Sequence, residues 1–305
     1  MGVCFVSQCC DRCAGGDYDS TGKRPASGSV FERSDLSEVD RTDIAHKVLM
    51  RRRRTDARIA AEYDGGTWSR QLRDRKWKQA SSLADYLDHR ASGIELKATI
   101  DSRLWSVPAG DYYQFRRDKL TRLLGHYTHD GDKLTEIGCG TGHILLGLSL
   151  DKRWRKLVRL DISETGIEVG REIARQFAVA NVEFGQIDLR DPASPAFARL
   201  KGQTVFSHYC LEQLPDATEQ VFRNLISAGI ERAILIEPSF ELLSWTSLRQ
   251  IASKTYVLRQ DYQRSIVKIA RKLESEGAIR IIDARALDFV SGVRNTPTVL
   301  VWEPT

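Results

Sequence analysis

The sequence predicts an α/β fold built on a doubly wound, mostly parallel sheet, with a C-terminal antiparallel hairpin and an N-terminal helical cap. Three observations support this fold class. Between residues 132 and 237, short apolar runs typical of strands alternate with amphipathic stretches typical of helices. A glycine-rich turn follows the first of these runs. Near the C-terminus, two strand-like runs succeed each other with no helix between them.

Five apolar runs are expected to form the parallel strands, because each is short and leads into a turn or a helical stretch. They cover residues 133–137, 156–162, 181–189, 203–210 and 231–237. Helices are expected between them at residues 143–150, 163–178 and 216–228. Ser163 is a suitable N-cap, since its hydroxyl can accept a hydrogen bond from a free N–H group of the first turn.

The C-terminal part differs from this alternation. Residues 241–277 have a mostly helical pattern, and residues 279–289 and 298–302 have the pattern of strands. Only residues 291–297 join these two runs, which is too short for a helical crossover. The two strands are therefore expected to pair as an antiparallel hairpin, at the end of a domain that spans residues 131–305.

The N-terminal part is expected to contain a tail and the helical cap. Residues 1–40 are rich in Gly, Ser, Asp and Cys and have no sustained period, which predicts a disordered tail. The cap is expected to span residues 41–130 and to contribute to the acceptor region. Its helical patterns cover residues 41–64 and 67–98, interrupted at Gly65-Gly66, and then residues 112–124 with Asp111 as the N-cap.

The composition is that of a soluble protein, with 41% hydrophobic residues, 29% charged residues and a net charge of +5. No apolar run approaches the roughly 20 residues that span a bilayer, and the first residues lack the pattern of a signal peptide. A cytoplasmic protein with no membrane partner is therefore expected. Basic residues gather at 51–54 and 70–78. We favour solvated helix faces for these runs, and binding of a nucleic acid or an anionic surface is the alternative.

Metal binding is not predicted. Cys10 and Cys13 have C-x-x-C spacing, and Cys4 and Cys9 lie nearby in the sequence. A zinc site would need a second such pair or well-spaced histidines, and the sequence supplies neither. No pair of carboxylates has the spacing of a metal site either.

The glycine-rich turn is the strongest candidate for a ligand site. It consists of Glu136-Ile137-Gly138-Cys139-Gly140-Thr141-Gly142 at the end of the first strand. Glycines let the backbone turn sharply and let a ligand approach the main chain without a Cβ in the way. A dinucleotide site would need the spacing G-x-G-x-x-G, but His143 stands at the position of its third glycine. That departure counts against a nicotinamide cofactor.

This segment is similar to motif I of the class I S-adenosylmethionine (SAM)-dependent methyltransferases, which have a Rossmann-like fold. The resemblance covers residues 132–238 and implies that the methionine part of SAM lies against the loop. It also implies that Asp161 accepts from the ribose hydroxyls and that Asp188 accepts from the adenine amino group. The full set of cofactor-binding residues that it implies is Glu136, Gly138, Cys139, Gly140, Thr141, Gly142, Asp161, Ile162, Asp188, Leu189 and His208.

The end of the fourth strand is expected to face the acceptor. In small-molecule methyltransferases this region resembles a pattern ending in Glu-His-Leu, and here Gln213 stands in place of the histidine. The Asn/Asp-Pro-Pro-aromatic run of nucleic-acid N-methyltransferases is missing, so nucleic acid is an unlikely acceptor. Residues 211–215, Glu237-Pro238 and residues 295–298 resemble bacterial sugar O-methyltransferases. This resemblance implies a small hydroxylated acceptor, such as a sugar or a natural product.

A hydroxyl acceptor needs a base, and three residues are candidates. His208 ends the fourth strand, where a base could reach the transferred methyl group; alternatively, it only lines the cofactor cleft. Glu212 and Glu237 are the other candidates. The acceptor pocket is expected around Trp105, the helix 112–124 and residues 242–262 with Trp245, Tyr256 and Tyr262, although core packing would also explain these aromatic residues.

Two other functions stay open at this point. The chain could methylate a protein or RNA that the basic N-terminal arm recruits, or it could be a non-catalytic SAM-binding subunit, which the departure at Gln213 would suit. A homo-oligomer is compatible with each of these functions.

Overall fold

The computed structural model describes residues 32–33, 53–89, 93–101, 103–291 and 295–305. The predicted disordered tail lies outside these ranges, apart from the short strand β1 (Glu32–Arg33). The four N-terminal cysteines lie outside them as well. Among the described residues, no helix is both long enough and apolar enough to cross a membrane.

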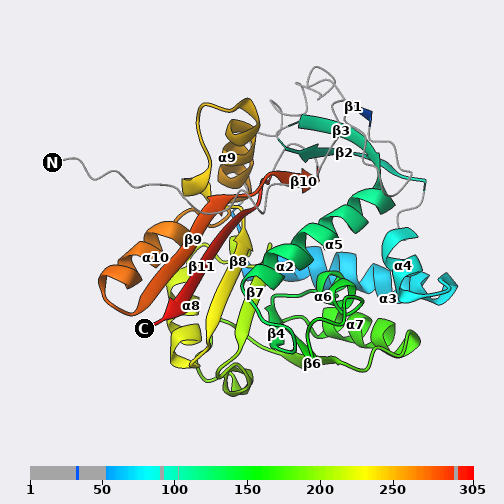
Figure 1. Ribbon diagram of the computed structural model, residues 1–305, viewed down its shortest axis with the longest axis horizontal. Coiled ribbons are helices and arrows are strands. Elements are labelled where there is room, and N and C mark those ends of the chain that lie inside the picture. Colours follow the sequence, from blue (N-terminus) through cyan, green and yellow to red (C-terminus); the bar gives the residue numbers. More distant parts are fainter. Residues whose placement is uncertain (1–31, 34–52, 90–92, 102, 292–294) are drawn as a thin grey trace.

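A large central sheet organises the molecule (Figure 1). Its strands, in spatial order, are β6 (Val182–Gln186), β5 (Lys156–Asp161), β4 (Lys133–Ile137), β7 (Thr204–His208), β8 (Arg232–Glu237), β11 (Thr298–Pro304) and β9 (Ile279–Ala286). The first five run parallel, and β11 is antiparallel to both of its neighbours. The predicted parallel strands and the C-terminal hairpin are thereby confirmed.

The strand order reverses direction at β4. The chain moves outward from β4 to β5 and β6, and then returns to pair β7 with the other edge of β4. In open α/β sheets, ligands bind outside the carboxyl ends of the strands at such a switch point. The glycine-rich loop after β4 lies there.

Side chains alternate between the two faces of the large sheet, as the period of a strand requires. In β7, Phe206 belongs to the core on the side of α5 (Ala109–His126) and α6 (His143–Leu148). Its neighbour Val205 belongs to the core on the side of α8 (Thr218–Ser227) and α10 (Ile266–Ser275). Two helical layers therefore cover the sheet.

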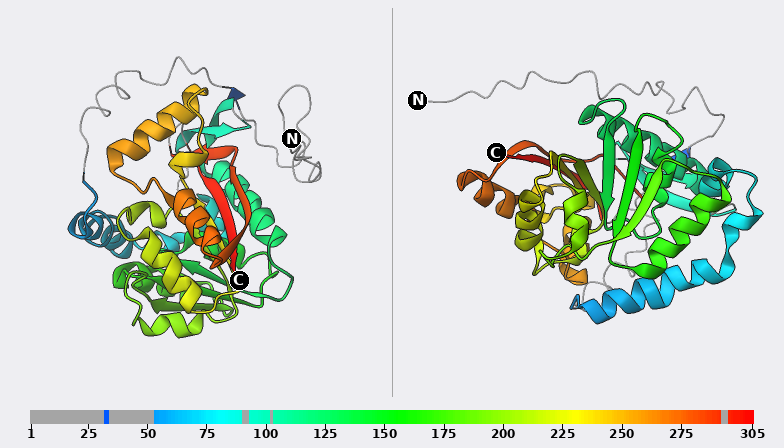
Figure 2. Two further views of the ribbon diagram at one scale, coloured as in Figure 1. Left: turned by 90° about the vertical axis from the view of Figure 1, so that its left-hand side faces the viewer. Right: turned by 90° about the horizontal axis from the view of Figure 1, so that it is seen from below.

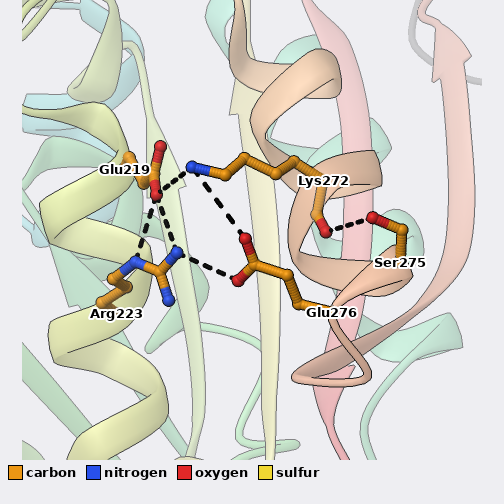
Figure 3. Close-up of polar contacts among 5 residues, drawn as sticks. All are labelled: Glu219, Arg223, Lys272, Ser275 and Glu276. Atoms are coloured by element: carbon orange, nitrogen blue, oxygen red, sulfur yellow. Dashed lines mark hydrogen bonds and ion pairs between the residues drawn. The ribbon is translucent and has the colours of Figure 1, made fainter.

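An ion-pair network joins α8 to α10 (Figure 3). Glu219 pairs with Arg223 at 2.8 Å and with Lys272 at 2.7 Å, and Arg223 reaches Glu276 at 3.0 Å. All four side chains are partly exposed, so solvent screens these pairs. The apolar contacts beneath them hold the two helices on the sheet.

A second, antiparallel sheet contacts α5 (Figure 1). Its order is β1, β3 (Arg103–Pro108), β2 (Glu95–Ile100) and β10 (Phe289–Ser291). The helix predicted at residues 67–98 was therefore wrong from Glu95 onwards, because this segment is strand β2, with Ala98 and Ile100 buried at strand spacing. Trp105, in β3, belongs to the apolar core, and α5 begins after Pro108 rather than after Asp111.

The N-terminal helix, residues 56–74, runs across one end of the large sheet (Figure 2). It consists of α2 (Asp56–Glu62), the π-helix η2 (Tyr63–Trp68) and α3 (Ser69–Asp74). Gly65 and Gly66 do not interrupt it as predicted; they lie inside the π-helical turn. π-Helical turns are rare and frequently mark functional sites.

The remaining helical segments connect these layers. They are η3 (Lys76–Gln79), α4 (Leu83–His89), α7 (Glu164–Gln176), η4 (Pro195–Arg199), η5 (Leu211–Gln213), η6 (Phe240–Leu242) and α9 (Leu248–Gln260). Helix α7 begins as predicted, because the hydroxyl of Ser163 accepts a hydrogen bond from Gly166 N at 2.8 Å.

Candidate active site

A cavity of about 600 Å³ lies at the carboxyl ends of β4, β5, β6 and β7. A volume of this size is typical of small-molecule and cofactor sites. Every residue expected to bind the cofactor lines it: Glu136, Gly138, Cys139, Gly140, Thr141, Gly142, Asp161, Ile162, Asp188, Leu189 and His208. The switch-point geometry thus gathers residues from four strand ends into one site.

The glycines of the loop are needed for steric reasons. Gly138 and Gly142 have φ values of 67° and 66°, in the left-handed region that favours glycine. A Cβ at Gly138 would overlap Cys210 Sγ, and one at Gly142 would overlap the guanidinium of Arg159. Side chains of the protein therefore pack against one side of the loop, and the other side of the loop faces the cavity.

Glu136 and Arg159 are two buried ionisable residues beneath the loop. They are direct neighbours across β4 and β5, with exposed fractions of 2% and 0%. Burial raises the pKa of Glu136 to about 7, although the positive charge of Arg159 opposes this shift. Arg159 also stacks on Phe184, with its guanidinium 4.7 Å from the ring centre. Glu136 Oε2 has no hydrogen-bond partner among the described residues, and Glu136 lines the cavity.

Asp161 ties the glycine loop to the end of β5. Its Oδ2 accepts a hydrogen bond from Gly140 N at 2.6 Å, and its Oδ1 accepts one from Ser163 N at 2.8 Å. Burial raises the pKa of Asp161, these two hydrogen bonds lower it, and the nearby carboxyl of Asp64 raises it further. Each oxygen keeps a free lone pair, so Asp161 can still accept from a ligand.

Asp188, the expected adenine acceptor, is held by an arginine. Arg190 Nε lies 2.9 Å from Asp188 Oδ1, and the Nη2 atom lies 3.0 Å from Oδ2. These bonds lower the pKa of Asp188, so it stays ionised. Arg190 Nη1 also contacts Asp56 Oδ2 of the N-terminal helix at 2.6 Å. This bridge fastens the start of that helix to the strand end that carries Asp188.

His208 lies at the end of β7 and lines the cavity as an uncharged ring. Burial lowers its pKa to about 3, and the positive charge of Arg116 contributes to the same shift. Arg116 comes from α5 and lines the cavity too. Tyr209 meets His208 edge to face, with ring centres 4.6 Å apart. The imidazole is therefore available as a hydrogen-bond acceptor at neutral pH.

Glu237 lies outside the cavity lining and supports the loop after β7. Its Oε1 accepts from Ser207 Oγ at 2.6 Å and from Cys210 N at 3.0 Å, and its Oε2 accepts from Glu212 N at 3.2 Å. Burial raises the pKa of Glu237 and these donors lower it. Such contacts fix the backbone that carries His208 rather than present a carboxylate to a substrate.

Glu212, the third candidate base, also lies outside the cavity lining. It accepts from Gln213 Nε2 at 2.8 Å and from Asn295 Nδ2 at 3.1 Å. Burial and the neighbouring Glu237 raise its pKa well above the usual range. Of the three candidate bases, His208 is the one that lines the cavity.

The sequence predicted a helical cap and acceptor region over residues 41–130, but did not single out the residues of the N-terminal helix that line the cavity. This helix contributes Asp56, Ile59, Ala60, Tyr63, Asp64, Trp68 and Gln71 to the lining. The signal in the sequence was weak, namely two aromatic residues flanking Gly65-Gly66 in an otherwise polar helix. Within the described chain, the aromatic residues expected around the acceptor do not line this cavity. Trp245 is 57% exposed, and Tyr256 packs against Tyr262 with ring centres 5.9 Å apart.

A family model described as a methyltransferase domain matches residues 128–299, more than half of the chain. The chain belongs to this methyltransferase family. The match begins just before β4, includes six strands of the large sheet and ends within the first residues of β11. It confirms the predicted class I methyltransferase and, with it, SAM as the methyl donor.

Several solved structures are similar to this chain in fold. Magnesium protoporphyrin IX methyltransferase from Synechocystis PCC 6803 is 19% identical, with 64% of this chain and 85% of that chain covered and a TM-score of 0.46. The pyocyanin biosynthetic protein PhzM is 15% identical, with 65% and 59% covered and a TM-score of 0.45. The methyltransferase domain of bacterial CtHen1-C is 16% identical, with 63% and 97% covered and a TM-score of 0.45. No curated protein sequence matches this chain.

The residues of the cavity suit this donor. SAM carries a sulfonium and an ammonium group against one carboxylate, so it is a net cation. More carboxyl than guanidinium groups line the cavity: Asp56, Asp64, Glu136, Asp161 and Asp188 against Arg116 and Arg190. The unpartnered Oε2 of Glu136 offers an acceptor to a cationic ligand.

Proposed function

We propose that this methyltransferase transfers the methyl group to a hydroxyl oxygen of a small acceptor, such as a sugar or a hydroxylated natural product. The observation that carries the proposal is the position of His208. Its neutral ring lines the cavity at the end of β7, directly beside the strand that carries the glycine loop. A neutral imidazole can accept a hydrogen bond from an acceptor hydroxyl and orient its lone pair.

The low pKa of His208 is compatible with this role. When bound, SAM supplies an electrophilic methyl group, which passes to the acceptor oxygen as the carbon–sulfur bond breaks. The hydroxyl proton becomes strongly acidic as the oxygen gains this bond, because a protonated ether is a far stronger acid than an imidazolium. His208 can therefore receive the proton late in the reaction, even though Arg116 disfavours its charged form in the free protein.

The side chains that line the cavity support a small acceptor. Tyr63, Tyr209, Gln213 and Leu214 line the part of the cavity around the end of β7. Aromatic rings and an amide suit the faces and hydroxyls of a sugar or a ring compound. The N-terminal helix covers this side, which restricts access for a macromolecule.

The basic arm gives less support to a macromolecular acceptor. Arg54, at the end of the basic run, is only 6% exposed, and its Nη1 atom lies 2.7 Å from Glu62 Oε2. Its guanidinium also lies 5.5 Å from the ring centre of Tyr262. Arg54 therefore fastens the arm to the body of the protein and is not exposed to a polyanion.

An acceptor screen with labelled SAM tests the proposal. A set of sugars and hydroxylated ring compounds is offered, each beside its deoxy analogue, and the hydroxylated member alone should become methylated. His208→Ala should then lower turnover by about 10² to 10⁴. The affinity for S-adenosylhomocysteine (SAH) should barely change, and the exposed His126→Ala is the matched control. Methylation of amines only, or near-normal turnover of His208→Ala, would contradict the proposal.

A further inference from the structure

We propose that Asp64 of the N-terminal helix binds the ribose of SAM together with Asp161. This inference deepens the cofactor assignment and rests on it. Asp64 lies in the π-helix η2, well before the residues 128–299 that the family model matches. A segment outside the family domain would thus complete its cofactor site.

The position of Asp64 carries the inference. It lines the cavity, and its Oδ1 atom accepts a hydrogen bond from Ser163 Oγ. Ser163 in turn donates its backbone N–H to Asp161 Oδ1 at 2.8 Å. The two carboxyl groups are thus neighbours across one serine, at the strand end where the ribose is expected.

Two neighbouring carboxylates are stabilised when a ligand donates hydrogen bonds to them. The proximity of Asp64 raises the pKa of the buried Asp161, which reflects repulsion between their negative charges. Both carboxyls accept hydrogen bonds and neither donates one when ionised. A ribose offers two adjacent hydroxyls, each of which can donate one hydrogen bond. If each carboxylate accepts one of them, the ligand satisfies both groups at once.

Contacts along the helix place Asp64 over the site. Asp56, at its start, pairs with Arg190, and Arg75, at its end, pairs with Glu172 of α7 at 3.2 Å. Between these two anchors, the ring of Trp68 packs over the glycine loop. A Cβ placed on Gly140 would lie 2.7 Å from Trp68 Cζ2.

The π-helical turn explains why the side chain reaches the site. A π-helix inserts one extra residue per turn and so widens the helix locally. Tyr63 and Trp68 begin and end this turn and stack on each other, with ring centres 5.4 Å apart. Both line the cavity with Asp64, so the turn presents its side chains to the ligand.

Calorimetry with SAH and its 2′-deoxy and 3′-deoxy analogues tests this inference on the full-length protein. Asp64→Asn should weaken SAH binding about tenfold, because an interaction with a charged acceptor is lost. For one of the two deoxy analogues, the variant and the wild type should have the same affinity. That analogue lacks the hydroxyl that would donate a hydrogen bond to Asp64. Asp74→Asn, an exposed carboxyl on the same helix, should leave all three affinities unchanged.

Two results would overturn the inference. One is an unchanged SAH affinity in both Asp64→Asn and Asp64→Ala. The other is an equal loss for SAH and for both deoxy analogues, which would indicate that Asp64 supports only the packing of the helix. These results concern cofactor binding alone and leave the choice of acceptor untouched. Failure of the wild type to bind SAH would instead contradict the cofactor assignment itself.

Discussion

Tyr209 donates a hydrogen bond from its hydroxyl to the backbone carbonyl of Asn295, at 2.8 Å. Both residues have left-handed backbones, with φ values of 57° and 61°. Tyr209 directly follows His208, and Asn295 lies just before β11. Left-handed conformations at residues other than glycine cost free energy and gather at functional sites. The contact between these two residues therefore fixes the loop that carries His208.

Asn295 should stabilise the protein through its side-chain hydrogen bond and through its tolerance of the left-handed backbone, and two variants separate these effects. Asn295→Gly removes the hydrogen bond to the buried Glu212 but tolerates the left-handed backbone, so we expect a loss of about 1–3 kcal/mol. Asn295→Ala removes the same bond and adds backbone strain, which costs about 1 kcal/mol more. Urea unfolding of the two variants beside the wild type measures both terms. Equal stability of the Ala and Gly variants would show that the backbone at this position is not strained.

Glu237→Gln separates a supporting role from a catalytic one. The glutamate accepts hydrogen bonds from Ser207, Cys210 and Glu212, and an amide turns one of its two acceptors into a donor. We expect the free energy of unfolding to fall by about 1–3 kcal/mol. Glu231→Gln, an exposed change just before the same strand, is the control. A variant with wild-type stability and abolished turnover would return Glu237 to the list of bases.

Glu136 should make the free protein less stable as the pH rises. Its pKa is about 7 in the folded state against 4.5 for the unperturbed group. Between these values the unfolded state has lost the proton and the folded state keeps it. The unfolded state therefore binds fewer protons, and the free energy of unfolding falls with pH across this window.

Glu136→Gln should remove that dependence. The difference in unfolding free energy between the variant and the wild type should grow by about 3 kcal/mol from pH 4.5 to pH 7 and then level off. Buried carboxyls that do not interact with Glu136 contribute equally to both proteins and cancel; the nearby Asp161, whose charge raises the pKa of Glu136, is the exception. Urea unfolding at several pH values, without cofactor, measures the difference. Parallel curves for the two proteins would mean that Glu136 ionises normally despite its burial.

The cofactor loop was predictable because its signals are local. Gly138, Gly140 and Gly142 lie in a strand-to-helix turn, in backbone conformations that few other residues adopt. Asp161 ends β5, and Asp188 lies just after β6. Parallel strands bring their carboxyl ends to one edge, so strand order alone places these residues together. No long-range contact had to be known.

The rest of the site depends on contacts between distant segments. Asp64 and Ser163 are 99 residues apart, and the polar helix that carries Asp64 has few apolar positions to show which face is covered. Glu237 ends β8 just as Asp161 ends β5, and Glu212 lies shortly after β7, so the sequence did not distinguish them. Their side chains point to donors of the protein rather than to the cavity, and that choice is made by tertiary hydrogen bonds.

His208 provides a final prediction, because its ring should stay neutral at pH values far below the usual pKa of a histidine. Burial and the charge of Arg116 lower its pKa to about 3, so the imidazole should not titrate between pH 5 and pH 8. NMR spectra of the histidine rings of the free protein, with His208 assigned by its absence in His208→Asn, follow this directly. A midpoint near 6.5 would show that water reaches the ring and screens Arg116.

Arg116→Gln tests the electrostatic part of the same prediction. Removing the positive charge should raise the pKa of His208 towards its usual value, but burial, the larger cause, should still hold it below 6.5. Arg122→Gln, an exposed change on the same helix, should leave the pKa of His208 where it is. The low pKa of His208 also makes the free energy of unfolding depend on pH. Between pH 6.5 and about 3, the unfolded state binds a proton on His208 and the folded state does not. The contribution of His208 to stability is therefore present above pH 6.5 and lost as the pH falls towards 3.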